Sequence, residues 1–333
     1  MSSKVLVIGA QGVLGSFIAR SFSDAGWEVT RAGRRAESAP DFRLLDLGDA
    51  KSVSEACRGV DLVVNTAHHP ELVLERTILG DGGTLIDLVE LSESERVGLR
   101  TDAADAHGLV VVDTGLGGVG YLAIAELLRE HPDADGAQYS LMVSASGSSG
   151  RAGALFGHRL LTGARHHRSA TIPCAEPFGR RRGIEIEPGS DSVLRRTVRG
   201  RAIRHYLCMQ PRALHGMLLA LNATRLISLL PRASFTAGTG KVPAELSDEG
   251  VCEWVAVSRG GQRLAARTLE GRGYYRMTAA ATVALADALV GSSEALRGLH
   301  SIDVLLTLSE LQPALERLGI TIRTQAVNGA RGD

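Results

Sequence analysis

The chain is short of several residue types, and each shortage excludes a class of protein. Only Lys4, Lys51 and Lys241 are lysines among its 333 residues, which leaves few amines for Schiff-base chemistry. The four cysteines stand far apart and form no C-x-x-C pair, so we expect reduced core thiols rather than a disulfide framework or a metal site. No apolar run is long enough to span a bilayer.

The chain also has no net formal charge, and we expect no export signal. A balanced charge provides no overall field to attract nucleic acid or an anionic membrane. The N-terminal residues include no basic segment followed by a small-residue cleavage site. We therefore expect a cytoplasmic protein whose partner is a small-molecule substrate. We expect no nucleic-acid or membrane partner.

What the sequence does contain is an alternation of apolar runs and helical patterns over its first 130 residues. The expected strands are residues 4–8, 27–30, 42–45, 61–65, 84–87 and 109–113. Strands and helices that alternate at this spacing predict an α/β fold with a Rossmann-type, doubly wound parallel sheet. We expect this domain to cover residues 1–130, because 333 residues suit two domains.

The pattern changes after about residue 135. Residues 138–146 alternate like a half-exposed strand, and residues 253–258 and 263–269 flank a turn as a hairpin does. Long helical patterns cover residues 212–230 and 301–318. We therefore predict a second, α+β domain over residues 131–270, with a mostly antiparallel sheet.

A glycine motif lies between the first strand and the first helix. Gly9, Gly12 and Gly15 follow the spacing G-x-x-G-x-x-G. Such glycines permit a tight turn close to a pyrophosphate, and the helix N-terminus offers N–H groups to it; the alternative is a turn without a ligand. We assign dinucleotide contacts here to Gly9, Gln11, Gly12, Val13, Leu14 and Gly15.

The end of the second strand indicates which dinucleotide is bound. An NAD site usually has Asp or Glu at this position, and Glu28 lies too early in the strand for that role. Arg31, Arg34 and Arg35 stand there instead, and guanidinium groups suit a 2′-phosphate because they bind it bidentately. We predict NADP(H) rather than NAD(H), with an exposed basic loop as the alternative.

Other strand ends supply further candidates, because ligands of open parallel sheets lie at the carboxyl edge. The 65–70 loop follows the fourth strand, and the glycine-rich 113–121 loop follows the sixth. Asp46 after the third strand suits a contact with adenine, or else caps the next helix. We assign cofactor contacts at these ends to Asp46, Leu47, Thr66, Ala67, Thr114 and Gly115.

Proton transfer has three candidate residues. His68 and His69 lie in the 65–70 loop, and imidazole exchanges protons near physiological pH; the alternative is a surface pair. Tyr121 is a donor from the glycine-rich loop, or else the first buried aromatic residue of its helix.

Together these residues resemble the saccharopine dehydrogenase-like oxidoreductases, which include saccharopine reductases and trans-acting enoyl reductases. The resemblance rests on residues 9–15 and 65–70, on Leu85-Ile86-Asp87 with Glu90, on the glycines after Asp113, and on residues 271–280. Gly117-Gly118 stands where the family often has Pro-Gly. The resemblance implies a nicotinamide-dependent reductase that forms a homodimer through its second domain. It also implies that residues 271–333 return to pack on the Rossmann domain.

A rival class with a similar glycine motif is excluded by its catalytic pair. Short-chain dehydrogenases need Tyr-x-x-x-Lys, and none of the five tyrosines here is followed by lysine at that spacing.

Residues 151–205 form a basic region. They include twelve arginines against four acidic residues, a formal balance of +8. Such a surface suits a carboxylate-bearing substrate or an acidic carrier protein that holds an acyl chain; the alternative is a solvated face.

We predict an NADPH-dependent oxidoreductase that reduces the C=N bond of an imine-type small molecule in amino-acid or specialised metabolism. Reduction of an enoyl C=C bond, on a free or carrier-bound acyl chain, remains open. A non-catalytic regulator that senses NADP(H) remains open as well.

Overall fold

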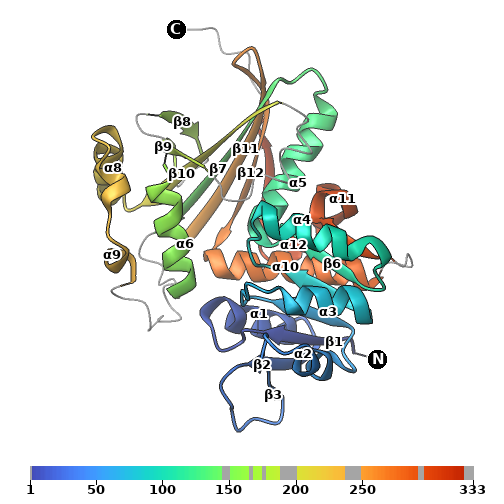
Figure 1. Ribbon diagram of the computed structural model, residues 1–333. Coiled ribbons are helices and arrows are strands. Elements are labelled where there is room, and N and C mark those ends of the chain that lie inside the picture. Colours follow the sequence, from blue (N-terminus) through green and yellow to red (C-terminus); the bar gives the residue numbers. More distant parts are fainter. Residues whose placement is uncertain are drawn as a thin grey trace. The chain divides into compact units, whose positions relative to one another are not determined.

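The computed structural model describes residues 2–144, 151–164, 168–174, 178–187, 201–236, 249–291 and 296–325 (Figure 1). Contacts divide the chain into two units, and each unit is built from two separate stretches. Met1–Val119 joins Tyr275–Leu318 in the first unit, and Gly120–Tyr274 joins Gly319–Asp333 in the second.

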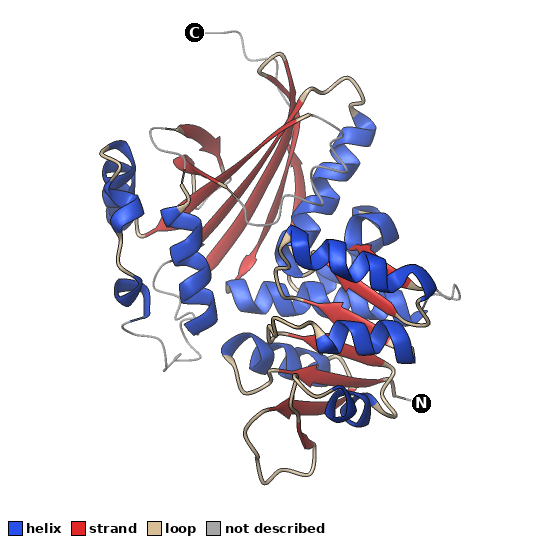
Figure 2. Cartoon of the chain, viewed as in Figure 1, coloured by secondary structure: helices blue, strands red, loops and turns tan. Residues whose placement is uncertain are grey.

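The first unit contains a parallel sheet flanked by helices (Figure 2). Within the described residues, its strand order is β13-β6-β5-β4-β1-β2-β3, and every pairing is parallel. Its strands are β1 (Lys4–Ile8), β2 (Glu28–Gly33), β3 (Phe42–Leu44), β4 (Leu62–Asn65), β5 (Thr84–Asp87), β6 (Leu109–Val112) and β13 (Gly298–Ser301). The predicted Rossmann-type sheet is confirmed.

The helices that connect or follow these strands are α1 (Val13–Asp24), α2 (Ala50–Cys57), α3 (Val73–Asp81), α4 (Glu93–Asp102), η1 (Ala103–Asp105), α5 (Gly115–Glu130), α10 (Tyr274–Gly291), α11 (Ile302–Leu305) and α12 (Leu308–Arg317). The helix expected over residues 301–318 is therefore divided in two. The division lies at Thr307, whose side chain caps α12 through a reciprocal pair with Glu310.

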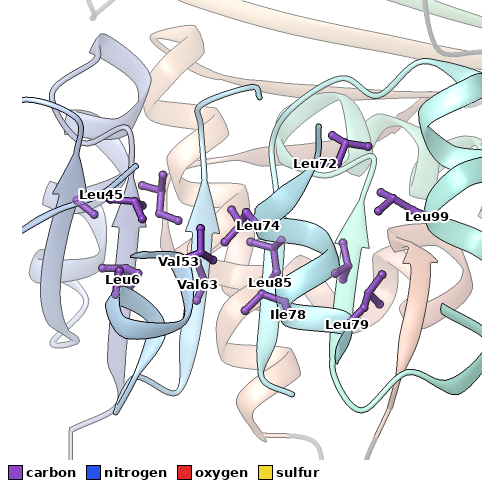
Figure 3. Packing of buried hydrophobic residues seen from close by; sticks show 14 of the residues in the cluster. Leu6, Leu45, Val53, Val63, Leu72, Leu74, Ile78, Leu79, Leu85 and Leu99 are labelled. Carbon is purple, nitrogen blue, oxygen red and sulfur yellow. The ribbon is translucent and has the colours of Figure 1, made fainter. Parts of the chain in front are cut away.

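The core of the first unit explains why its central strands β1, β4 and β6 are largely apolar. On one face of the sheet, strand residues such as Leu6, Val63 and Leu85 pack against helix residues such as Leu74 and Leu99 (Figure 3). Val5 and Val7 alternate with Leu6 along β1, so they point to the opposite face, and they are fully buried as well. A parallel sheet covered on both faces requires apolar residues on both.

β2 is longer than its sequence pattern predicted. We expected the strand to end at Arg31, whereas β2 continues to Gly33 and pairs Ala32 with Ile8 and Gly33 with Leu44. Ala32 is completely buried between its neighbours, which extends the ladder by two residues. Arg31 therefore lies inside the strand, while Arg34 and Arg35 follow its end.

The second unit contains the predicted, mostly antiparallel sheet. Its order is β14-β12-β11-β7-β10-β9-β8 within the described residues, and only β7 and β10 pair in parallel there. Its strands are β7 (Gly136–Ser144), β8 (Ser169–Pro173), β9 (Arg180–Ile186), β10 (Ala202–Gln210), β11 (Gly250–Arg259), β12 (Gln262–Arg272) and β14 (Thr321–Gln325). Gly260 and Gly261, both at positive φ, form the hairpin turn between β11 and β12.

The helices that lie wholly in the second unit include α6 (Arg151–Thr162), α8 (Arg212–Ala223), η2 (Leu226–Leu229) and α9 (Arg232–Thr236). The single helix expected over residues 212–230 is thus wrong. Arg225 has φ 63, a left-handed conformation that separates α8 from η2. No helix in the described part of the chain has the length and apolar character needed to cross a membrane.

Candidate functional site

The glycine motif forms a tight turn between β1 and α1. Gly9 has φ 79, and a Cβ on Gly15 would lie 2.2 Å from the backbone oxygen of Gly9. Gly12 is the N-cap of α1 and places no side chain over the first turn of that helix. The turn therefore needs glycine for backbone conformation and close packing, and the N–H groups of the first turn, including Val13 and Leu14, have no side-chain cap.

Gln11 ties this turn to the loop that follows β2. Its Nε2 donates to the backbone oxygen of Arg35 at 2.8 Å and to Oε1 of Glu37 at 2.9 Å. Its Oε1 would lie 2.7 Å from a Cβ on Gly33, so the amide packs directly over this glycine. The glycine turn and the basic loop are thus parts of one arrangement.

The three arginines assigned to a 2′-phosphate differ in their surroundings. Arg31 donates from Nε and Nη2 to the carboxylate of Asp41, at 2.8 and 3.2 Å, and its Nη1 lies 3.2 Å from Glu37. Arg34 and Arg35 are exposed, and their guanidinium groups make no hydrogen bond or ion pair within the described residues. Two of the three are therefore available to an anionic ligand, while Arg31 is already paired.

Thr66 and Ala67 at the end of β4 lie against the glycine turn, and their contact with a cofactor stays a prediction. Thr66 Oγ1 donates to the backbone oxygen of Ile8 at 2.8 Å. A Cβ on Gly9 would lie 2.5 Å from that hydroxyl and 3.3 Å from the Ala67 methyl group. The structure thus brings the ends of β1 and β4 together.

Asp46 and Leu47 shape the turn after β3. Asp46 Oδ1 accepts from the N–H of Gly48 at 2.9 Å, whereas the N-cap of α2 is Asp49. The alternative role of Asp46 as the helix cap is therefore wrong. Leu47 is partly buried against the core, and the contact of both residues with adenine stays a prediction.

His68 and His69 point to different neighbours. His68 is exposed, and its Nε2 lies 3.0 Å from Oε1 of Glu95 at the N-terminus of α4. His69 is half-buried and approaches Gly48, where a Cβ would lie 3.5 Å from its Nε2. Only His68 is held by a carboxylate in a way that suits a proton-transfer group.

Beneath this loop lies a buried polar cluster that our sequence analysis missed. Asn65 Nδ2 donates to Asp87 Oδ1 at 3.1 Å and lies 3.5 Å from Glu75 Oε1, and all three side chains are buried. Burial and the neighbouring Glu75 carboxyl raise the pKa of Asp87 well above its usual value. Asn65 Oδ1 accepts from the N–H of Ala67 at 2.9 Å, which links the cluster to the loop.

A second glycine-rich junction follows β6. Asp113 has φ 58 and forms a bidentate, fully buried ion pair with Arg96 of α4. Thr114 Oγ1 donates to the backbone oxygen of Asp87 at 2.7 Å, and Gly115 has φ 72 at the start of α5. Thr114 and Gly115 therefore lie at the same sheet edge as the β5 end.

Tyr121 belongs to the second unit, where polar groups are buried between α5 and the sheet. Its ring lies 5.6 Å from that of Tyr139, whose hydroxyl donates to Glu253. Glu253 is completely buried, and burial raises its pKa to about 8 despite the opposing effect of the Tyr139 hydrogen bond. Sequence reasoning missed this pair because Tyr139 and Glu253 stand 114 positions apart.

The basic region of residues 151–205 lies partly outside the described residues. In the described part, Arg168 pairs with Glu185 at 3.7 Å, and Arg182 Nε donates to Ser169 Oγ at 2.7 Å. Arg201 donates to the backbone oxygen of Pro132 at 2.8 Å. Several of these arginines therefore serve internal contacts, and a carrier-protein surface stays a prediction.

Comparison with known proteins gives a match for part of the sequence and for the whole fold. Residues 5–77 match the NAD dependent epimerase/dehydratase family. Apo saccharopine dehydrogenase (L-Glu forming) from Saccharomyces cerevisiae aligns over 98% of this chain and 100% of its own, with 12% identity and a TM-score of 0.64. No curated protein sequence matches the chain.

Two other solved structures align over most of the chain with lower similarity. An amine dehydrogenase from Mycobacterium smegmatis covers 87% of this chain and 93% of its own, with 12% identity and a TM-score of 0.45. A dipicolinate-bound dihydrodipicolinate reductase from a Paenisporosarcina species covers 92% and 100%, with 11% identity and a TM-score of 0.45.

Proposed function

We propose that this chain, which has the fold of saccharopine dehydrogenase, is an NADP(H)-dependent oxidoreductase that reduces the C=N bond of a small imine-type molecule. One observation carries the choice of cofactor. Arg34 and Arg35 follow β2 beside the glycine turn, and neither guanidinium has a partner in the described residues. Unpaired guanidinium groups at that position suit a 2′-phosphate.

The residues present fit a dinucleotide. A Cβ at Gly9 or Gly15 would collide with neighbouring atoms, which leaves a bare backbone turn in front of the uncapped N-terminus of α1. Such a turn accommodates a pyrophosphate through N–H groups and the partial positive charge of the helix end. When bound, a reduced nicotinamide supplies the hydride that the reaction needs.

The chain must then supply a proton to the substrate nitrogen, and His68 is our candidate donor. Its Nε2 faces Glu95, which holds the ring in position. Hydrogen bonds from Ser92 and His68 lower the pKa of Glu95 although partial burial opposes them, so this carboxylate is ionised at neutral pH. His68 Nδ1 is left to exchange a proton with the substrate.

The first test is a fluorescence titration with NADPH and NADH. We expect tight NADPH binding that Arg34→Ala and Arg35→Ala each weaken about tenfold, with little change for NADH. Arg20→Ala, which removes an exposed arginine of α1, is the matched control and should bind as the unmodified chain does. Equal or stronger binding of NADH by the unmodified chain would overturn the assignment of NADP(H).

The bond that is reduced is tested by the loss of NADPH absorbance with cyclic imines, keto acids plus amines, and enoyl thioesters. Turnover of imine substrates supports the proposal. Turnover of enoyl substrates alone would assign the chain to C=C reduction, and tight NADPH binding without any turnover would favour a regulator that senses NADP(H).

A cytoplasmic location and a homodimer formed through the second unit stay predictions. Light scattering in solution tests whether the chain forms a dimer.

A further inference from the structure

Glu37 is an acidic side chain beside the proposed 2′-phosphate site. Its Oε1 accepts from Gln11 Nε2 at 2.9 Å, and the same nitrogen donates to the backbone oxygen of Arg35 at 2.8 Å. Glu37 and Arg35 are thus both tied to the amide of Gln11, which belongs to the glycine turn. Glu37 lies four residues past the end of β2, outside the strand positions where an NAD site usually carries its acid.

An uncompensated carboxylate at this place opposes NADP(H). A carboxylate near the end of the second strand favours NAD because it accepts from the ribose hydroxyls. It also repels the doubly charged 2′-phosphate. Whether the site prefers NADP(H) or NAD(H) therefore depends on whether a positive charge offsets the carboxylate of Glu37.

Arg31 places a positive charge against that carboxylate. Its Nη1 lies 3.2 Å from Glu37 Oε2, and its Nε and Nη2 hold Asp41. The hydrogen bond from Arg31 lowers the pKa of Asp41, so this carboxylate too is ionised at neutral pH. The Arg31 and Glu37 side chains are only 32% and 33% exposed, so the pair is less screened by water than a freely exposed one.

We propose, on the basis of the NADP(H) site proposed above, that Arg31 is a specificity-determining positioning residue rather than a phosphate ligand. Its single positive charge offsets one of the two negative charges of Glu37 and Asp41, and this allows Arg34 and Arg35 to bind the 2′-phosphate. Without Arg31, the two carboxylates would shift the preference of the site towards NADH.

The test compares ligands that differ by the 2′-phosphate alone. Dissociation constants are measured for NADPH and NADH by fluorescence, and for 2′,5′-ADP and 5′-AMP by calorimetry. We expect Arg31→Gln to weaken NADPH and 2′,5′-ADP about fivefold, as the loss of a partly screened ion pair predicts, while NADH and 5′-AMP bind equally well or more tightly. Adding Glu37→Gln, and then Asp41→Asn, to this variant should restore the affinity for NADPH and 2′,5′-ADP.

The controls separate a charge effect from a structural one. Arg20→Gln removes an arginine that pairs with Asp24 on α1 and should change none of the four constants. If Arg31→Gln weakens all four ligands equally, or if removing the acids restores nothing, Arg31 merely holds the loop and the proposal is wrong. If the unmodified chain binds neither NADPH nor 2′,5′-ADP, the proposed function fails instead.

Discussion

At the scale of single residues, proton chemistry depends on how a side chain is held. His68 and His69 are adjacent in the sequence, yet only His68 faces a carboxylate, at 3.0 Å. Glu95 is held in position for this contact because the same side chain also forms the capping box of α4 with Ser92. The start of a helix thus fixes the position of the partner of His68.

This arrangement predicts a selective loss of turnover in His68→Gln. We expect kcat with an imine substrate to fall about 10²- to 10⁴-fold, because a general acid is removed, while the dissociation constant of NADPH changes less than twofold. His107→Gln, at an exposed histidine of the same unit, is the control. A similar loss in both variants, or none in His68→Gln, would reject His68 as the donor.

Glu253 predicts a pH effect on stability. Its carboxyl is buried, accepts one hydrogen bond from Tyr139, and has its second oxygen without a partner in the described residues. Burial raises its pKa from 4.5 to about 8, so between these values the unfolded chain loses a proton that the folded chain keeps. Stability therefore falls as pH rises through this window and levels off above it.

Glu253→Gln keeps the shape of the side chain and removes this titration. The free energy of unfolding of both proteins is measured in urea at pH 6 and pH 8.5. From the lower to the higher pH, the value for the variant should rise by on the order of 2–3 kcal/mol relative to that of the unmodified chain. Parallel changes in the two proteins would mean that Glu253 is already ionised when folded.

At the scale of elements, the close approach of α1 to the end of β1 creates the glycine turn. Gly15→Ala would place a methyl group 2.2 Å from a backbone oxygen that cannot move aside easily. We expect a loss of about 1–3 kcal/mol in the free energy of unfolding, together with loss of NADPH binding. Gly80→Ala on α3 is the matched control, because nothing lies within 4 Å of its Cβ and alanine favours the helix. Unchanged NADPH binding in Gly15→Ala would contradict this account.

At the scale of the whole molecule, the first unit is completed by a segment that returns from the other end of the chain. β13 pairs with β6 at the edge of the sheet, and α10 contacts α1 through Phe17–Tyr275 and the turn after α1 through Trp27–Asp287. The N-terminal stretch alone therefore lacks part of its sheet and part of its core. The fold is shared with saccharopine dehydrogenase, and the resemblance noted from the sequence motifs is confirmed at that level.

This discontinuity predicts that residues 1–273 do not fold alone. We expect this fragment to be insoluble or to unfold without cooperativity in urea, and to bind no NADPH, because the contacts of α10 and β13 are missing. Co-expression with residues 274–333 should restore NADPH binding. Cooperative unfolding of the truncated fragment by itself would show that the returning segment is dispensable.

The sequence by itself determined the features that depend on local pattern. Short apolar segments that alternate with helical patterns predicted the parallel sheet, and the glycine spacing predicted the turn at Gly9. Alternation in residues 138–146 and the turn at Gly260–Gly261 predicted the antiparallel sheet. The ends of the strands were predicted less well. β2 continues to Gly33 because it pairs with both β1 and β3, and the local sequence pattern does not show such pairing.

Only the tertiary structure decided which charged and polar groups meet. Arg31, Arg34 and Arg35 look alike in the sequence, but Arg31 forms ion pairs with Asp41 and Glu37. The guanidinium groups of Arg34 and Arg35 have no partner in the described residues. Arg96 reaches Asp113 across 17 positions, and Asn65 reaches Asp87 across 22. The local sequence allows a charged or polar side chain on a helix or loop either to face solvent or to bind another side chain. Which of the two occurs depends on the distant segments that the fold brings beside it.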